Sequence, residues 1–274
     1  MSVDRKKIVV IGGGNGSSVA LRGLKSYDVD LTAIVTMFDS GGSTGILRDE
    51  FGYPPLGDIR QCLVALSPEE NDRVSAFNSA LDFRFDSGSS LRGHSVGNLV
   101  LAALTTVYHG VQGAIDEMSR MMQLQGQVVP VTLDEAHLCA RLVDGQVIRT
   151  ESAIDLRGGN GPGIDKVFLD ADVKANPRAL DAITNADAIL LGPGDLYTSV
   201  IPNLLVDEIS HAICDTPAPV IYACNLMTKL GETAGYSCSM FAGEVVRYIG
   251  SRKLDYLLVN TGTFSDEVLN GYAD

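Results

Sequence analysis

The sequence predicts a doubly wound α/β fold with a mostly parallel sheet, and three observations lead to it. Residues 7–11 (KIVVI) form a short apolar run typical of a buried parallel strand. A glycine loop, a helical pattern (NGSSVALRGLKSY) and a second strand (LTAIVTMFD) follow directly. The same alternation returns late in the chain, in AILLGPG, PVIYACN and LDYLLVN. We therefore expect residues 1–274 to form one α/β domain.

The segments between these strands are expected to be helical at first and β-rich in the middle. Apolar residues at three- and four-residue spacing predict helices in DIRQCLVALS and in NDRVSAFNSALDFRF. A longer helical pattern over residues 98–122 is expected to break in two near His109. Residues 126–170 contain short β-like runs, and the Asp-Gly pair at 144–145 between two of them is a strong hairpin signal. We predict a small β-rich insertion there.

The composition excludes several classes of protein. With 45% hydrophobic and 20% charged residues the chain is expected to be soluble and globular. Its net charge of −13 offers no broad basic surface to nucleic acid or anionic membranes. The apolar runs are too short for a membrane span or a signal peptide. The five cysteines show no paired spacing, which argues against a disulfide framework or a zinc cluster. We expect a cytoplasmic protein.

Residues 38–60 (FDSGGSTGILRDEFGYPPLGDIR) are the most informative segment. They follow a predicted strand and combine glycines that allow close backbone approach with prolines, acids and arginines. Polar side chains at the carboxyl end of a strand are where α/β sheets place their sites. The alternative is an acidic surface loop, but a connector does not need this density of special residues.

The first glycine loop, residues 12–18, lies between a predicted strand and a helix start. Backbone amides and the positive end of a helix favour phosphate there. The loop fits the dinucleotide fingerprint only in part, because Ser17 occupies the place of the third glycine, although Asp39 follows the second strand as that fingerprint requires. We expect nucleotide or phosphate binding, with NAD as a less favoured special case.

A second motif, Gly93 to Gly97, matches the GxSxG nucleophile elbow of serine hydrolases. That elbow requires an apolar strand immediately before the serine, and DSGSSLR is not one. We favour instead a helix start with Ser95 or Asn98 as its cap. Residues 192–199 form another strand–glycine loop–helix unit, and two such loops on neighbouring strands would form opposite walls of one crevice. A third unit begins at Cys224.

The sequence carries no motif for a transition metal. Asp39, Asp58 and Asp195 would suit Mg²⁺ if a phosphate bridged them, since Mg²⁺ prefers oxygen ligands. Guanidinium groups bind phosphates in a bidentate manner. We expect three arginines to meet the phosphates of a ligand: Arg48, Arg60 and Arg92.

Taken in order, these loops resemble the CofD-like superfamily and, within it, the YvcK branch of gluconeogenesis factors. The matching stretches are IGGGNGSSVALRGLK, FDSGGSTGILRDEFG with PLGDIRQCLVALS, GHSVGNLVLAAL, LGPGDLYTSVIPNLLV and CNLMTKLGETAGY, which span nearly the whole chain. The resemblance implies a Rossmann-like sheet and a nucleotide-type ligand. YvcK-like proteins are associated with UDP-sugars such as UDP-N-acetylglucosamine, with gluconeogenic growth and with cell shape. CofD itself uses Mg²⁺ to transfer a phospholactyl group from a guanylated precursor to a deazaflavin.

Carried over residue by residue, the resemblance implies a ligand site built from the four glycine-containing loops, with Asp39 as the candidate metal ligand. The expected ligand-binding residues are Gly13, Gly14, Asn15, Gly16, Asp39, Gly41, Gly42, Ser43, Arg48, Asp58, Arg60, His94, Ser95, Asn98, Gly194, Leu196, Tyr197, Thr198, Ser199, Asn225 and Tyr272.

Two departures from the family pattern bear on function. The family usually has Thr where Asn15 stands and a second Asp where Ser40 stands. Ser40 removes a carboxylate from the expected metal cluster, which favours a nucleotide-sugar-binding regulatory protein. The alternative is a Mg²⁺-dependent 2-phospho-L-lactate transferase-like enzyme. The expected partner is a small nucleotide or nucleotide sugar, with no nucleic acid and no membrane insertion, and a homo-oligomer stays open.

Overall fold

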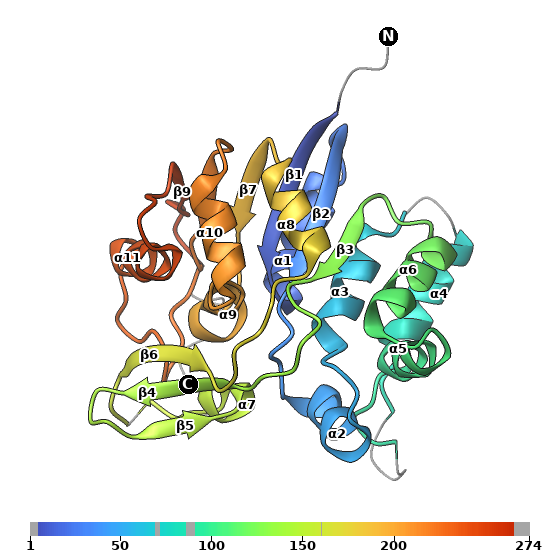
Figure 1. The fold of residues 1–274 in the computed structure, drawn as a ribbon, viewed down its shortest axis with the longest axis horizontal. Helices are drawn as coiled ribbons and strands as arrows, with labels where there is room; N and C mark the ends of the chain where they lie inside the picture. The colour runs from blue at the N-terminus through green and yellow to red at the C-terminus, as the bar shows by residue number, and fades with distance from the viewer. Residues whose placement is uncertain (1–4, 69–71, 86–90, 160, 266–274) are drawn as a thin grey trace.

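A computed structural model of the chain describes residues 5–68, 72–85, 91–159 and 161–265. Its centre is a six-stranded sheet in the order β3-β2-β1-β7-β8-β9, in which every pair is parallel (Figure 1). The strands are β1 (Lys6–Gly12), β2 (Val29–Val35), β3 (Gln127–Pro130), β7 (Ala188–Leu191), β8 (Val220–Ala223) and β9 (Tyr256–Leu258). The strand order reverses between β1 and β7, which is the point where doubly wound sheets place their ligands. The predicted fold class is confirmed.

Helices cover both faces of this sheet. In Figure 1, α8 (Pro177–Thr184) and α10 (Asp207–Asp215) lie on the near face and α1 (Gly14–Leu24) lies behind it. The apolar strands are buried between these layers, and Val10 and Ile11 of β1 are 0% exposed. The other helical segments are α2 (Gly42–Phe51), α3 (Gly57–Leu66), α4 (Asp72–Asp82), α5 (Val96–Val107), α6 (Val111–Met122), η1 (Leu196–Val200), α9 (Ile201–Leu204) and α11 (Cys238–Ile249). The predicted break between α5 and α6 is confirmed, with His109 at a φ of 55°.

A separate three-stranded antiparallel sheet, β5-β4-β6, lies below the carboxyl ends of the main strands in Figure 1. It contains β4 (Leu138–Leu142), β5 (Val147–Arg149) and β6 (Ile164–Leu169), together with the short helix α7 (Glu151–Asp155). The predicted hairpin turn is present, and Gly145 adopts the positive φ of 90° that it requires. One boundary was wrong: the run QVVP pairs with β2 as β3 of the main sheet, so the small sheet begins only at β4.

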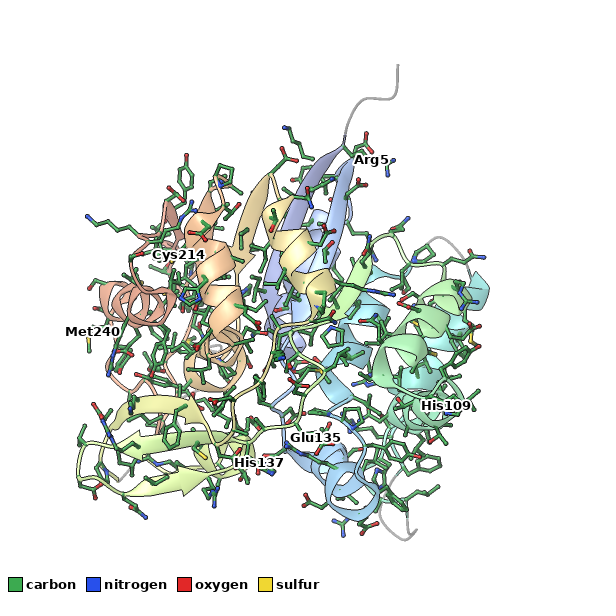
Figure 2. The ribbon with its side chains drawn as sticks, in the orientation of Figure 1. Arg5, His109, Glu135, His137, Cys214 and Met240 are labelled. Atoms are coloured by element: carbon green, nitrogen blue, oxygen red, sulfur yellow. The ribbon has the colours of Figure 1, made fainter. Side chains whose placement is uncertain are left out.

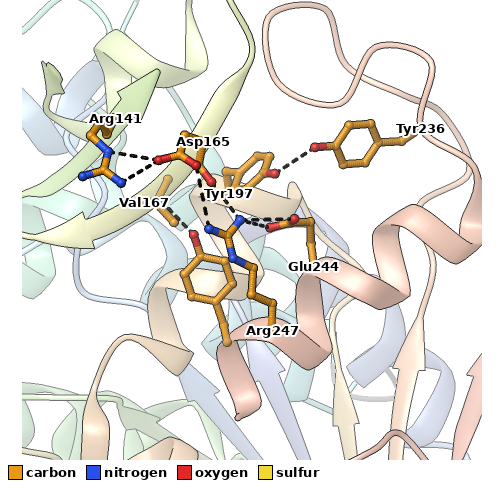
Figure 3. Close-up of polar contacts among 8 residues, drawn as sticks. Arg141, Asp165, Val167, Tyr197, Tyr236, Glu244 and Arg247 are labelled. Atoms are coloured by element: carbon orange, nitrogen blue, oxygen red, sulfur yellow. Dashed lines mark hydrogen bonds and ion pairs between the residues drawn. The ribbon is translucent and has the colours of Figure 1, made fainter. Parts of the chain in front are cut away.

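Polar contacts join the small sheet to α11 (Figure 3). The backbone N–H of Val167 donates to Tyr248 Oη at 2.8 Å, and Arg247 Nη1 donates to the carbonyl oxygen of Asp165 at 2.8 Å. The carboxylate of Asp165 accepts two hydrogen bonds from Arg141 on the neighbouring strand. These contacts fix the small sheet, and α7 with it, at the carboxyl edge of the main sheet.

Two further features of the described residues bear on the class of protein. No helix among them is long and apolar enough to cross a membrane. The five cysteines are free thiols in the structure, and Cys62, Cys139 and Cys224 are buried.

Candidate functional site

The two glycine loops at the switch point are packed directly against each other. Gly16, near the start of α1, lies over Gly194 of the loop after β7. A Cβ atom on Gly16 would come within 2.9 Å of Gly194 N, closer than real Cβ atoms approach backbone. Gly16 therefore has no room for a side chain, and the two loops are neighbours, as their positions after adjacent strands predict.

The first glycine loop is covered by a carboxylate from α3. Asp58, in the first turn of that helix, accepts the backbone N–H of Gly14, and a Cβ on Gly14 would lie 2.8 Å from Asp58 Oδ1. Burial of the carboxyl group and the nearby charge of Asp39 raise the pKa of Asp58 to about 7. The amide expected to face a phosphate is thus engaged by an acid, which is largely protonated below neutral pH.

A second acid reaches this edge from α7. The Glu151 carboxylate accepts the backbone N–H of Ser40 at 3.2 Å and forms a side-chain hydrogen bond with Asp39. Burial and the charge of Asp39 raise the pKa of Glu151 to about 8. Ser40 also bonds the Ser152 hydroxyl at 3.1 Å. Asp39, Asp58 and Glu151 therefore form an acidic cluster whose mutual repulsion a proton or a cation would relieve. Oxygen donors of this kind suit Mg²⁺.

The central loop forms a buried hydrogen-bond chain. Asn98 Nδ2 donates to Ser43 Oγ at 3.3 Å, and Ser43 Oγ lies 2.9 Å from His94 Nδ1. The three side chains are all buried. Ser95 caps α5 by accepting the N–H of Asn98 at 3.2 Å and forms an isolated bridge with Arg84, and residues 91–93 shortly before it form a turn and not a strand. This confirms the helix-cap interpretation and removes the context for a hydrolase elbow.

The late glycine loop divides into core and edge residues. Leu196 and Tyr197 are buried in the hydrophobic core, and Tyr197 Oη lies 2.9 Å from Tyr236 Oη, as Figure 3 shows. Their side chains therefore pack inward. Thr198 is also buried, whereas Ser199 is half-buried.

Lys229, from the loop after β8, lies in a cage of three carboxylates. Its ammonium group donates to Asp155 of α7, to Asp195 Oδ2 at 2.8 Å, and lies 3.0 Å from Glu232 Oε1. Glu232 is 5% exposed, and burial raises its pKa to about 7 despite the lysine. The cage joins the late glycine loop, the loop after β8 and the small sheet at one point.

Several buried polar atoms at this edge have no hydrogen-bond partner among the described residues. Buried polar groups in proteins are normally paired, so a concentration of unpaired ones indicates that something else supplies their partners. The unpaired atoms are Ser17 Oγ, Thr36 Oγ1, Gln61 Oε1, Asn98 Oδ1, Thr198 Oγ1, Asn203 Oδ1 and Glu232 Oε2.

The three arginines expected to meet phosphates are dispersed. Arg60 is 4% exposed and pairs with Asp82, at a cavity of about 450 Å³ that also borders Asn15. Arg48 donates to the carbonyl oxygen of Ala136 at 2.8 Å and borders a different cavity, of about 500 Å³. That cavity lies between α2 and the segment carrying Glu135 and His137 (Figure 2). Arg92 is exposed on a turn.

The remaining predicted residues are placed as follows. Asn225 accepts a long hydrogen bond from Tyr222 Oη at 3.5 Å. Tyr272 lies outside the described residues. Sequence reasoning missed Glu151, Lys229 and Glu232. Only Lys229 and Glu232 carried a signal, because they stand in the strand–loop unit that begins at Cys224.

Comparisons with known proteins identify relatives of this chain by sequence and by fold. The family model described as 2-phospho-L-lactate transferase CofD matches residues 8–274. A relative from Bacillus subtilis, named gluconeogenesis factor, is 41% identical over 98% of this chain and 83% of its own length. A relative from Nostoc sp. is 46% identical over 97% of this chain, which spans only 58% of that relative. A crystal structure of a Bacillus halodurans protein superposes with a TM-score of 0.92 at 42% identity, covering 98% of this chain and 85% of that one.

Proposed function

We propose that this chain, which belongs to the 2-phospho-L-lactate transferase CofD family and is similar to gluconeogenesis factors, is a nucleotide-sugar-binding regulatory protein. Its ligand would be of the UDP-N-acetylglucosamine type and would lie at the carboxyl edge of the sheet, in a cytoplasmic protein that links gluconeogenic growth to cell shape. The observation that carries the proposal is the set of buried, unpaired polar atoms at that edge.

These unpaired atoms match the chemistry of a nucleotide sugar. Thr36, Gln61 and Thr198 offer hydroxyl and amide groups of the kind that bind sugar hydroxyls and base edges. Each buried polar atom that lacks a partner costs about 1–3 kcal/mol, and a ligand that pairs several of them recovers that free energy on binding. The protonated forms of Asp58 and Glu151 would add hydrogen-bond donors toward the ligand.

A thermal-shift screen tests this proposal. UDP-N-acetylglucosamine, GDP with Mg²⁺, and NAD are compared at equal concentrations, since a ligand at 100 times its Kd stabilises the folded state by about 2.7 kcal/mol. The proposal predicts the largest shift with the UDP-sugar. Stabilisation by NAD with none by the UDP-sugar would overturn it.

A second function, Mg²⁺-dependent phospholactyl transfer, is favoured by one observation. Glu151 supplies the carboxylate that Ser40 lacks and forms a side-chain hydrogen bond with Asp39, and this pair presents oxygen donors of the kind that Mg²⁺ prefers. A bound Mg²⁺ would neutralise charge on a transferring phosphoryl group. Asp39 and Glu151 would hold the ion, and the positions of their side chains are fixed by the backbone N–H groups of Gly41 and Ser40.

Turnover separates the two functions. A guanylated phospholactate and a deazaflavin acceptor are incubated with the protein and Mg²⁺, and the phospholactyl product is measured. Product formation that is lost in Glu151→Gln would establish the transferase. Binding of the UDP-sugar without turnover would leave the regulatory function as the only one of the two that is supported.

A further inference from the structure

We propose that Arg22, Arg60 and Arg84 form a pocket for the phosphate or diphosphate group of a small molecule. The three side chains line one cavity of about 450 Å³ between α1, α3 and the end of α4. A cavity of this volume falls in the range of small-molecule sites, roughly 300–1,000 Å³. The arginines come from three separate segments, which only the packing of α1 against α3 and the chain leaving α4 brings together.

The charge of this pocket is opposite to that of the protein. Among the described residues that line it, three are arginines and one, Asp82, is a carboxylate, whereas the whole chain carries a net charge of −13. Burial lowers the pKa of Arg60, and the positive charge of Arg84 lowers it further. Like charges held this close destabilise one another, and an anion between them removes that repulsion.

Of the three arginines, Arg60 is the one whose side chain is held in place by packing. Its side chain is 4% exposed and runs over Gly97, where an added Cβ would lie 3.0 Å from Arg60 Cγ. One guanidinium nitrogen donates to Asp82, but the buried Nε has no partner in the described part of the chain. Guanidinium groups match the oxygens of phosphate in geometry and charge, so the head of Arg60 suits an anion in the cavity that it lines.

An anion is favoured in the arginine pocket over the backbone amides of the neighbouring glycine loop. Asp58 already accepts the N–H of Gly14, so a phosphate there would meet a carboxylate. Asn15 and Gln61 border the arginine pocket, and Gln61 also contacts the position of a Cβ on Gly14, at 3.5 Å. The pocket is therefore adjacent to the proposed ligand site. Its anion is either the diphosphate of a nucleotide sugar, which rests on the proposed function, or a separate phosphorylated metabolite.

Calorimetric titration with inorganic pyrophosphate tests the pocket on its own. Ionic strength is held constant, because screening weakens contacts between exposed charges. We expect Arg22→Ala and Arg84→Ala each to weaken pyrophosphate about tenfold, as loss of a hydrogen bond to a charged group does. Asp82→Asn should tighten binding severalfold, because Asp82 competes with the anion for Arg60. The control, Arg141→Ala, removes the same charge from the small sheet and should leave the affinity unchanged.

Three results would overturn the assignment: no binding of pyrophosphate to the wild type, equal affinities across the variants, or the same weakening by Arg141→Ala. A second titration adds UDP-N-acetylglucosamine in competition. Displacement of pyrophosphate by the UDP-sugar assigns the pocket to the diphosphate of that ligand. Simultaneous binding assigns it to a separate phosphorylated metabolite. Binding of pyrophosphate without binding of the UDP-sugar leaves the pocket standing and removes the proposed function.

Discussion

Ser40 donates its backbone N–H to Glu151 Oε2 over 3.2 Å, although 111 residues separate them in sequence. The contact brings a carboxylate from α7 of the small sheet to the loop after β2, where it hydrogen-bonds with Asp39. The loop therefore keeps a pair of acids even though its own second position is a serine. The absence of an acid at Ser40 is accordingly weak evidence against metal binding, and both candidate functions use this edge.

Stability should fall as the pH rises from about 5 to about 8. The pKa values of Asp58 and Glu151 are raised from 3.8 and 4.5 to about 7 and about 8 in the folded protein. Over that range the folded state holds protons that the unfolded state has lost, so each rise in pH favours unfolding. Glu151→Gln should reduce the slope of the free energy of unfolding against pH. At pH 8 the free energy of unfolding of this variant should exceed that of the wild type by more than about 1 kcal/mol. Urea unfolding at a series of pH values from 4 to 8 measures this pH dependence.

The matched control is Glu50→Gln, which removes an exposed carboxylate from α2. It should keep the slope of the wild type. If Glu151→Gln also kept that slope, the acidic cluster would not exist in solution. Added Mg²⁺ should flatten the slope of the wild type if Asp39 and Glu151 bind the ion.

The packing of the two glycine loops predicts opposite outcomes for two glycines of α1. Gly16→Ala should cost about 2 kcal/mol or more, because the new methyl group would press on the backbone of Pro193 and Gly194. Gly23→Ala, on the same helix, meets nothing within 4 Å and should stabilise the protein by up to about 1 kcal/mol. Thermal unfolding of both variants checks this. Equal effects would mean that the loops are not in contact.

Lys229→Met should destabilise the protein increasingly as the pH rises through 7. The lysine compensates Asp155, Asp195 and Glu232, and the pKa of Glu232 is about 7 even in its presence. Without the ammonium group, ionisation of the buried acid has no counter-charge, so the loss grows with pH. The double variant Lys229→Met/Glu232→Gln should recover much of the loss at pH 8. A loss independent of pH would show that the lysine only fills space.

Arg60→Ala should lower stability as well as phosphate affinity. Its stem packs over Gly97 while its head pairs with Asp82, so truncation removes buried contacts. Because Asp82 is half exposed, at 52%, we expect a moderate loss of about 1–3 kcal/mol. Chemical denaturation measures it, with Asp82→Asn as the comparison that keeps the arginine. A fully stable Arg60→Ala variant would contradict the packing described for this side chain.

The main sheet was predictable because its strands are local and strongly patterned. KIVVI and AILL are apolar runs followed by glycine, a pattern typical of parallel strands, and their buried residues are Val9, Val10, Ile11, Ile189 and Leu191. The run QVVP was misplaced for the same reason: β3 is one more apolar strand, and only its pairing with β2 separates it from the small sheet. Periodicity identifies a strand but not its partner.

The candidate site was predictable only where its residues stand in glycine loops. His94, Ser43 and Asn98 were expected from such loops, and they form one hydrogen-bond chain. Glu151 was missed because it reaches the site through the docking of the small sheet, which no local pattern encodes. The same is true of Arg22 and Arg84, which lie on the outer side of α1 and just beyond α4 and converge only through helix packing.

Thr198→Val tests the central claim most directly, because it replaces a buried hydroxyl that has no partner in the described residues with a methyl group of similar size. The variant without ligand should be at least as stable as the wild type, since an unsatisfied buried polar atom is removed. Calorimetric titration of the variant with UDP-N-acetylglucosamine should show binding about tenfold weaker than to the wild type. Wild-type protein that does not bind the UDP-sugar, or equal affinity in both proteins, would contradict the central claim.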